Sequence, residues 1–313
     1  MKVIDLFCGP GGFSTGFEMA GFETIAAFDY EKDAVETFSA NHQCVASQQD
    51  LTDYDYSGLP SVDVLIGGPP CTQFSTAKNN KTRNILAGMT LVQSFLRAVH
   101  VLKPRYWIME NVPAIQNYLP SVIPLSFIGL PEKGNFEIPM KAELLASDYG
   151  APQNRKRYLI GNFPLPTITH GDSGKAELFS EDLSEWRTMG DTLAGLPEPL
   201  LNKREGYVYD PNYRIPLSFS DLSDHFSDTR FNGLELISLR NAKLEHPYMG
   251  RMAWPDRSDR PARTVVATQL GRETLILQSK SGDYRRATVR ECATLQSFPI
   301  TYQFFGKSYK PNN

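Results

Sequence analysis

The residue best suited to covalent chemistry is Cys71, in the segment Gly67-Gly68-Pro69-Pro70-Cys71-Thr72-Gln73-Phe74-Ser75. A structural cysteine usually sits inside an apolar run, whereas Cys71 follows one and comes directly after a Pro-Pro pair. The prolines restrict the backbone, which would hold a nucleophile in place at little entropic cost. Because a free thiol is mostly un-ionised near neutral pH, it also needs nearby positive charge or a helix dipole. We predict that Cys71 is reactive.

Two further motifs could assist such a nucleophile. Glu110 begins the sequence Glu110-Asn111-Val112-Pro113 after another apolar run. A lone acid there is most often solvated or capping, but beside a nucleophilic loop it becomes a candidate proton donor, since partial burial can raise the pKa of a glutamate. The run Gln153-Asn154-Arg155-Lys156-Arg157 is basic, and taken alone it is typical of a charged surface.

A glycine-rich turn, Asp5-Leu6-Phe7-Cys8-Gly9-Pro10-Gly11-Gly12-Phe13, lies between a strand-like and a helix-like segment. Glycines allow close approach of a ligand to the backbone, and the helix N–H groups can bind a carboxylate or phosphate. Asp29 follows the next strand-like run, where an acid can accept hydrogen bonds from ribose hydroxyls. This spacing suits a nucleoside cofactor without choosing between a dinucleotide and S-adenosylmethionine.

The elements that must position these motifs alternate between strand and helix. Strands are expected at 3–7, 24–28, 62–66 and 106–109, and helices at 12–20, 31–41 and 85–102. This order predicts an α/β fold, a doubly wound, mostly parallel sheet with helices on both faces. Loops 8–12, 29–31, 67–75 and 110–113 would then gather at the edge formed by the carboxyl ends of the strands.

Beyond residue 164 the composition changes: the sequence becomes rich in Pro, Ser, Asp and Tyr and has no long periodic segment. We expect a first domain over 1–163, a second, smaller and irregular domain over 164–265, and a return to the first domain over 266–313. Regular patterning resumes in a helix expected at 288–296.

Composition narrows the class of protein. The 313 residues are 41% hydrophobic and 21% charged, which is ordinary for a globular chain. No apolar stretch is long enough to span a membrane and no signal peptide begins the chain, so a cytoplasmic location is the default expectation. The four cysteines form no C-x-x-C pair and no His lies at ligand spacing, so neither disulfides nor a metal is expected.

Charge alone argues weakly against a nucleic-acid partner, because the formal net charge is −3. A basic cleft can still occur on an acidic protein. Arginines are frequent at 240–290 and absent from the first 80 residues. They could line such a cleft or form a solvated surface.

Together, the motifs resemble the DNA cytosine-5 methyltransferases. The resemblance runs from residue 3 to about 306, apart from a variable middle, and it is specific because five motifs occur in the family's order. They are Phe7-Cys8-Gly9-Pro10-Gly11-Gly12; Pro69-Pro70-Cys71; Glu110-Asn111-Val112; Gln153 to Arg157; and Thr288-Val289-Arg290-Glu291 with Leu295-Gln296-Ser297-Phe298-Pro299.

The resemblance implies a Rossmann-like methyltransferase fold, S-adenosyl-L-methionine as cofactor and double-stranded DNA as partner, with 164–265 as a target-recognition domain. Cys71 would add to carbon 6 of cytosine and make carbon 5 nucleophilic. Glu110 would protonate ring nitrogen 3, and Arg157, supported by Arg155, would bind the carbonyl oxygen of the base. Because a base inside a duplex cannot be reached in this way, the target must be flipped out.

On the cofactor side, the resemblance implies a loop around S-adenosylmethionine, an acid at the ribose and an acid at the adenine amine. The matching residues are Phe7, Gly9, Gly11 and Gly12 for the loop, Asp29 for the ribose and Asp50 for the adenine, with Tyr30 and Pro69 also in the pocket.

The chain departs from the family pattern in three places. Thr72 replaces the glutamine that commonly follows the nucleophile. Residues 113–139 lack the usual helix and Gly-Tyr pair, and their prolines suggest extended chain. The family ends with a Gly-Asn-Ala-Val-Pro segment and a returning helix, whereas this sequence stops at Asn313. We therefore expect either that the chain is cut short or that a second polypeptide supplies the helix.

The leading hypothesis is a DNA-modifying enzyme, bacterial or phage, of restriction or defence type. One alternative is the tRNA-methylating branch, which shares the catalytic motifs but carries only a compact recognition region. A second is a non-catalytic or conditionally active subunit of a two-chain methyltransferase. The DNA target sequence cannot be deduced from these residues.

Overall fold

The computed structural model describes residues 1–70, 85–172, 183–199, 205–222, 224–245, 253–266 and 274–306. The chain divides into two compact units. Unit 1 comprises 1–144, 156–166 and 303–308, and unit 2 comprises 145–155, 167–302 and 309–313. Of residues 266–313, which were expected to return to the first domain, 303–306 lie in unit 1. Residues 274–302 pack in unit 2, where Leu275 and Leu295 share a buried cluster with Met189 and Ala262.

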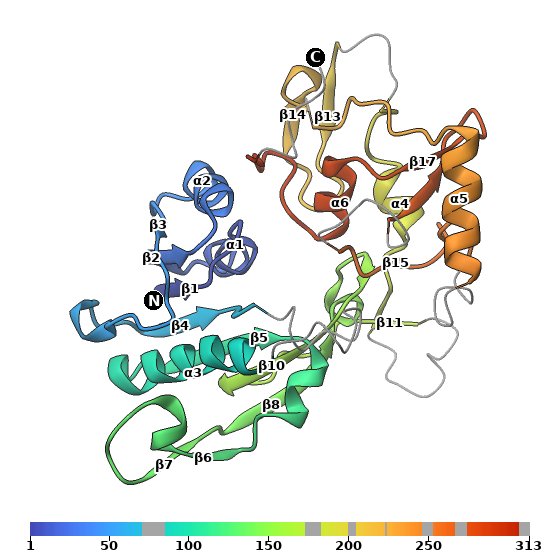
Figure 1. Ribbon diagram of the computed structural model, residues 1–313. Helices are drawn as coiled ribbons and strands as arrows, with labels where there is room; N and C mark the ends of the chain where they lie inside the picture. The colour runs from blue at the N-terminus through green and yellow to red at the C-terminus, as the bar shows by residue number, and fades with distance from the viewer. Residues whose placement is uncertain are drawn as a thin grey trace. The chain divides into compact units, whose positions relative to one another are not determined.

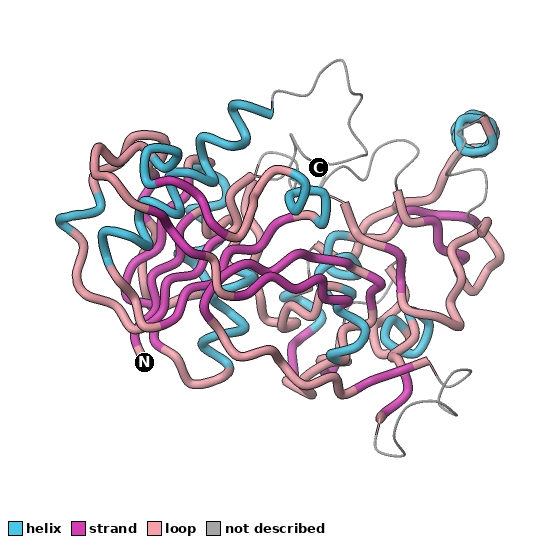
Figure 2. Tube along the Cα trace, turned by 90° about the horizontal axis from the view of Figure 1, so that it is seen from below, coloured by secondary structure: helices cyan, strands magenta, loops and turns pink. Residues whose placement is uncertain are grey.

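Unit 1 is built on a seven-stranded sheet (Figures 1 and 2). Its strands run in the order β3 (Ser47–Gln48), β2 (Glu23–Asp29), β1 (Lys2–Leu6), β4 (Val64–Gly67), β5 (Tyr106–Asn111), β10 (Lys156–Asn162) and β8 (Met140–Leu145). Strands β3, β2, β1, β4 and β5 pair in parallel, and β10 runs antiparallel to β5. This confirms the predicted doubly wound, mostly parallel sheet.

Helices cover both faces of this sheet, as side-chain alternation along the strands requires. Val3 and Ile66 pack on one face with Phe13 and Phe17 of α1 (Gly12–Met19). On the other face Ile4, Leu6 and Leu65 join the apolar residues of α3 (Ile85–Leu102). A third helix, α2 (Lys32–Asn41), buries Phe38 in a smaller cluster with Cys8, Ala27 and Ala46.

The segment 113–139 is more structured than its prolines suggested. It contains two 3-10 helices, η3 (Pro113–Asn117) and η4 (Leu125–Ile128), and an antiparallel pair of short strands, β6 (Val122–Pro124) and β7 (Asn135–Glu137). The expectation of extended chain is therefore wrong for much of the segment. The reason is burial: Ile115, Ile123 and Ile128 each lie in the main core of unit 1.

Unit 2 consists of short elements joined by irregular chain. They are β9 (Gln153–Asn154), β11 (His170–Gly171), β12 (Ser184–Glu185), α4 (Met189–Leu193), β13 (Tyr207–Tyr209), β14 (Pro216–Ser218), α5 (Gly233–Leu244), β15 (Ala262–Arg263), β16 (Ile276–Gln278), β17 (Tyr284–Arg286) and α6 (Val289–Leu295). The described part of unit 2 also contains two 3-10 turns, η5 (Ala146–Tyr149) and η7 (Phe219–Asp221).

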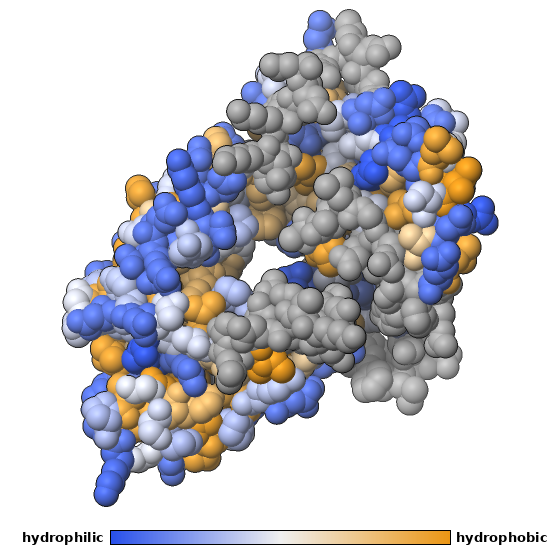
Figure 3. Space-filling model, in the orientation of Figure 1, coloured by the Kyte–Doolittle hydropathy of each residue, from blue (hydrophilic) through white to orange (hydrophobic). Residues whose placement is uncertain are grey.

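Helix α5 is a regular element of 12 residues in a region that we expected to be irregular. Its apolar residues are divided between two sides: Leu239 is buried, whereas Leu234, Ile237 and Leu244 are exposed. Hydrophobic atoms are visible along α5 in Figure 3. A helix with apolar residues on two sides has a weak amphipathic pattern, which is why periodicity did not reveal it.

Candidate active site

The carboxyl ends of four strands meet at one edge of the unit 1 sheet, as predicted from the strand order. Leu6 pairs with both Phe28 and Gly67, and Gly67 pairs with Met109, so β1, β2, β4 and β5 end side by side. The glycine-rich turn, Asp29, the turn before Cys71, and Glu110 therefore share this edge. Cys71 and residues 72–84 lie outside the described residues, which include Pro69 and Pro70.

The glycine-rich turn has a backbone that favours glycine. Gly9 and Gly11 have φ of 55° and 95°, in the left-handed region, and Phe7 shares this region at 59°. A side chain at Gly9 would meet no atom within 4 Å, so the turn is open there. Gly12 begins α1. The turn thus presents open backbone at the start of a helix, where a ligand carboxylate can bind.

Asp29 ties this turn to the end of β2. Its Oδ2 accepts a hydrogen bond from the Gly9 N–H at 2.8 Å, and its Oδ1 accepts one from the Glu31 N–H at 2.9 Å. A carboxylate has about four acceptor positions, so both oxygens keep capacity for ribose hydroxyls. Neighbouring Tyr30 is exposed, and its carbonyl accepts from Gln48 Nε2 at 3.1 Å.

Asp50 is brought toward Asp29 by β3, an element that the sequence did not reveal. Asp29 pairs with Gln48, and the Gln49 N–H donates to the Asp29 carbonyl at 2.8 Å. Asp50 is exposed and lines a pocket of about 430 Å³ together with Gln49, Thr52, Asp53, Tyr54 and Asp55. A hydrogen bond from Thr52 to its side chain lowers the pKa of Asp50, which keeps this acceptor ionised.

The turn that leads to Cys71 is held from two sides. Gly67 allows close packing, since a side chain there would come within 2.4 Å of the Leu6 carbonyl and 2.8 Å of Phe95. Asn111 is fully buried; its Nδ2 donates to the Pro69 carbonyl at 3.2 Å and its Oδ1 accepts from the Val112 N–H at 2.9 Å. Asn111 belonged to a recognised motif, but its function as a link between β5 and this turn was not foreseen.

Glu110 and Arg157 form an ion pair at the same edge of the sheet. Both side chains are partly exposed, at 26% and 19%. A Cβ at Gly68 would lie 3.6 Å from Glu110 Oε2, so the carboxylate lies next to the turn that precedes Cys71. The structure therefore brings together the predicted proton donor, one predicted base-binding arginine and the turn before the predicted nucleophile.

The other part of the basic run belongs to unit 2. Gln153 is buried, donates to the Leu295 carbonyl at 3.2 Å and accepts from the Val265 N–H at 3.3 Å, so it anchors the run. Arg155 is half-buried in this unit, and its carbonyl accepts from the Ala146 N–H at 2.9 Å. Of the two predicted arginines, only Arg157 lies in the same unit as Glu110.

Most described arginines of residues 240–290 have structural partners. Arg257, Arg263, Arg285, Arg286 and Arg290 all pair with carboxylates, namely Asp259, Asp256, Glu291, Glu235 and Asp224. Arg285 and Glu291 are nearly fully buried. The largely buried Arg263, Arg285 and Arg290 are therefore held by partners within unit 2, whereas the Arg257–Asp259 pair is exposed.

A buried acid, not foreseen, supports the glycine-rich turn. Asp5 of β1 is fully buried and accepts a hydrogen bond from the Ser14 hydroxyl of α1 at 2.7 Å. Burial, together with the charges of Asp29 and Glu18, raises the pKa of Asp5 to about 7. The Asp5–Ser14 bond joins the two elements that flank the turn. The sequence carried one indication of this buried acid, because Asp5 lies among the apolar residues of the strand expected at 3–7.

The three described cysteines are poor candidates for a nucleophile. Burial raises the pKa of Cys8 and Cys44, and it raises the pKa of Cys292 to about 12. Each shift disfavours the reactive thiolate. Among the described residues, no group of acidic, His or Cys side chains could hold a metal ion, and no helix is long and apolar enough to cross a membrane.

Comparison with known proteins shows the family to which this chain is related. The model of the C-5 cytosine-specific DNA methylases matches residues 1–311. The chain is 30% identical over 320 residues to the type II methyltransferase M.FnuDI of Fusobacterium nucleatum, covering 97% of this chain and 86% of the relative. It is 36% identical over 356 residues to M.DdeI of Desulfomicrobium norvegicum, covering 98% and 80%.

A solved structure with a similar fold is a DNA modification methyltransferase encoded within a prophage of E. coli. It shares 22% identity with a TM-score of 0.61, over 97% of this chain and 90% of that chain. At this identity the likeness concerns the fold alone, and it agrees with the sheet of unit 1. With the family match along almost its whole length, the chain belongs to the C-5 cytosine-specific DNA methylases, enzymes that methylate carbon 5 of cytosine in DNA.

Proposed function

We propose that this protein methylates carbon 5 of a cytosine flipped out of duplex DNA, through a transient covalent bond to Cys71. The observation that carries the proposal is the Glu110–Arg157 ion pair beside the Gly67–Pro70 turn, which leads directly to Cys71. The relatives named above are type II methyltransferases. We therefore propose a modification enzyme that acts at one short DNA sequence.

The residues at the sheet edge fit S-adenosyl-L-methionine. The open backbone at Gly9, within the turn formed by Phe7, Gly11 and Gly12, leaves room for the methionine portion. Asp29 would accept from the ribose hydroxyls and Asp50 from the adenine amine, and we assign Tyr30, next to Asp29 in the chain, and Pro69, after β4, to the same cofactor site. When bound, the cofactor supplies a methyl group on a positively charged sulfur, which is an electrophile.

The chain's own residues would prepare cytosine to react with this electrophile. The Cys71 thiolate forms a bond to carbon 6, and the ring electrons move toward carbon 5 as Glu110 delivers a proton to nitrogen 3. Arg157 holds the carbonyl oxygen of the base, and its ion pair with Glu110 places both groups on one edge of the ring. Once carbon 5 carries the methyl group, a water molecule takes the carbon 5 proton, the carbon 6–sulfur bond breaks to release the Cys71 thiolate, and the nitrogen 3 proton returns to the Glu110 carboxylate.

Asn111 would be a positioning residue in this scheme. It does not contact the base; it holds the Pro69 carbonyl and thereby the backbone two residues before Cys71. A nucleophile must lie within about 3–3.5 Å of the atom that it attacks, and small displacements are costly. The buried amide would therefore affect the rate of bond formation more than the binding of cofactor.

The experiment that tests the proposal is transfer of radiolabelled methyl groups to duplex DNA or to tRNA. We expect label in duplex DNA, with bisulfite sequencing locating the methylcytosine in one recurring short sequence. Label in tRNA alone would assign the chain to the tRNA-methylating branch. Label in neither substrate, from folded protein that binds S-adenosylmethionine, would contradict the proposed activity.

A further inference from the structure

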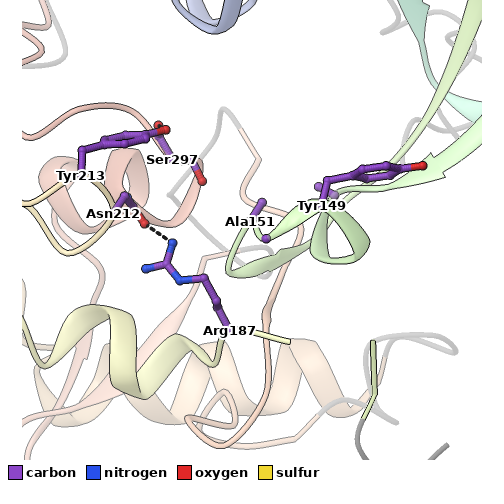
Figure 4. Close-up of a pocket in the computed structure, with 8 residues that line it drawn as sticks. Tyr149, Ala151, Arg187, Asn212, Tyr213 and Ser297 are labelled. Carbon is purple, nitrogen blue, oxygen red and sulfur yellow. Dashed lines mark hydrogen bonds between the residues drawn. The ribbon is translucent and has the colours of Figure 1, made fainter. Parts of the chain in front are cut away.

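Unit 2 contains a pocket of about 360 Å³ that the proposed chemistry does not use (Figure 4). Its lining includes Tyr149 and Ala151, from the segment around η5. Arg187, the residue before the N-cap of α4, lies beside them. Asn212 and Tyr213, between β13 and β14, and Ser297, after α6, complete the wall. Four separate segments of unit 2 thus converge around one cation.

Arg187 is oriented in this pocket by neutral groups. Its Nη1 donates to Asn212 Oδ1 at 2.7 Å, and its Nη2 donates to the Pro211 carbonyl at 3.0 Å. Figure 4 shows the guanidinium pointing toward Asn212 along the first of these bonds. Because a guanidinium has five N–H donors, two bonds to neutral oxygens orient it without an ion pair to any described carboxylate and leave further donors for a ligand.

This arrangement differs from that of most other arginines in the described part of the chain. Arg187 has no carboxylate partner among the described residues. By contrast, at least seven of the described arginines pair with carboxylates, namely Arg157, Arg230, Arg257, Arg263, Arg285, Arg286 and Arg290. A half-buried, oriented arginine without an ion pair to a described carboxylate is the arrangement expected of a site for an anion.

The acidic residues beside the pocket are committed to other partners. Asp210 accepts from the N–H groups of Asn212, at 2.7 Å, and Tyr213, at 3.1 Å, and from the Ile300 N–H. Asp148 accepts from Trp186 Nε1 at 3.0 Å. The Tyr213 hydroxyl donates its proton to the Ser297 carbonyl at 2.8 Å. The free donors of Arg187 are thus left for a ligand.

We propose that this pocket binds a backbone phosphate of the DNA substrate, with Arg187 as the ligand. A phosphodiester presents two oxygens in the geometry that a guanidinium fork matches. The proposal rests on the proposed function, because it takes DNA as the source of the phosphate. Phosphate contacts set the register of a protein on a duplex without reading its sequence, so the pocket would contribute to affinity and positioning rather than to target choice.

The test compares Arg187→Gln with Arg257→Gln in the full chain. Both variants remove one positive charge from unit 2, but Arg257 pairs with Asp259 at an exposed position. The slope of log affinity against log salt for duplex DNA should become shallower by about 0.9 for Arg187→Gln and stay unchanged for Arg257→Gln. Equal slopes for wild type and Arg187→Gln, or equal changes in both variants, would overturn the proposal.

Single methylphosphonate substitutions in the duplex then locate the contact. Wild type should lose affinity at one particular phosphate, and Arg187→Gln should be insensitive there while keeping the remaining pattern. If Arg187→Gln does not fold, Arg187→Lys carries the test. It should keep the wild-type slope yet bind roughly three- to tenfold more weakly, because the bidentate contact is lost. Unchanged affinity would contradict the proposal, whereas absence of DNA binding by wild type would contradict the proposed function instead.

Discussion

The Glu110–Arg157 ion pair is the side-chain arrangement on which the proposed chemistry depends most. Glu110 is the penultimate residue of β5, and Arg157 lies in β10, which runs antiparallel to β5. The pair is partly exposed at the strand ends, where a substrate could approach. A second ion pair, Glu143–Lys156, lies on neighbouring strands at 3.2 Å and is more exposed. Variants of this second pair show how much activity is lost when any ion pair of these strands is removed.

Glu110→Gln should slow methyl transfer by ~10²–10⁴-fold at every pH, because an amide cannot deliver a proton to the ring. The measurement is single-turnover transfer to duplex DNA with saturating cofactor. Glu143→Gln is the control and should leave the rate unchanged, since exposed pairs contribute little. A loss below about tenfold in Glu110→Gln would mean that the proton comes from elsewhere.

Asp5 gives unit 1 a pH dependence with a definite sign. Its pKa is about 7 in the folded chain against an ordinary value of 3.8, with burial as the main cause. The folded state therefore holds this proton more tightly. The resulting stabilisation is complete below about pH 4 and is lost as pH rises through 7.

Asp5→Asn removes this titration and should keep the bond from Ser14, since an amide oxygen also accepts. Between pH 4 and 8 the free energy of unfolding of wild type should fall relative to the variant, by at most about 4 kcal/mol. Asp55→Asn is the control, because hydrogen bonds from Ser57 lower the pKa of Asp55. The free energy of unfolding of Asp55→Asn should differ from that of wild type in how it changes as pH falls below the ordinary pKa of aspartate, 3.8, rather than as pH rises. Parallel curves for wild type and Asp5→Asn would refute the assignment.

At the scale of elements, the buried side chain of Asn111 links β5 to the turn at Pro69. Asn111→Ala should lower kcat by roughly 10- to 100-fold with little change in KM for S-adenosylmethionine, because the turn at Pro69, which precedes Cys71, loses one hydrogen bond. The control is Asn162→Ala, which removes a similar bond, to the Arg105 carbonyl at 3.1 Å, in an exposed residue that ends β10. If Asn111→Ala and Asn162→Ala had a similar kcat, or if only KM changed, Asn111 would not be a positioning residue for the turn before Cys71.

Most elements of the unit 1 sheet could be predicted because apolar runs are separated by glycine and proline. The bounds of α3 were predicted correctly, and those of β1, α1, β2, α2 and β4 within two residues. Strand β3 was missed because two residues carry no periodicity, and β8 because most of its residues are half-buried on both faces. Alternation of strand and helix sufficed to predict the shared edge, since parallel strands point the same way.

The side-chain partnerships at the site could not be predicted in the same way. The bond between Asp5 and Ser14 and that between Asn111 and Pro69 depend on the packing of elements, not on spacing within one motif. Arginine frequency suggested a basic cleft at 240–290, but five of these residues pair with carboxylates, two of which, Glu235 and Asp224, are distant in sequence. Arg187 stood out only once its neutral partners were visible.

At the scale of the whole molecule, each unit has its own core and its own polar anchor. In unit 2 the buried Glu291 accepts from Arg285 Nη1 and Nη2, both at 2.7 Å, and from the Thr288 N–H at 2.8 Å. The Thr288 hydroxyl in turn accepts from the Glu291 N–H, which completes a capping box at the start of α6. Removing one partner leaves a buried charge uncompensated.

Glu291→Ala should therefore destabilise unit 2 by about 3–5 kcal/mol and leave unit 1 protected. Hydrogen exchange followed by mass spectrometry measures the protection of each unit separately. Peptides from α6, β16 and β17 should exchange faster, while those from β1, β4 and β5 should exchange as in wild type. Equal loss of protection in both sets would mean that the units unfold as one.

The most direct measurement for the central claim is covalent trapping on a duplex whose target cytosine is replaced by 5-fluorocytosine. Fluorine at carbon 5 cannot leave as a proton does, so the bond from sulfur to carbon 6 should persist after methyl transfer. Wild type with S-adenosylmethionine should form a denaturant-stable adduct, and peptide mapping should locate it at Cys71, with Cys71→Ser binding the duplex but forming none. An adduct at another residue, or none from enzyme that methylates ordinary DNA, would contradict the account.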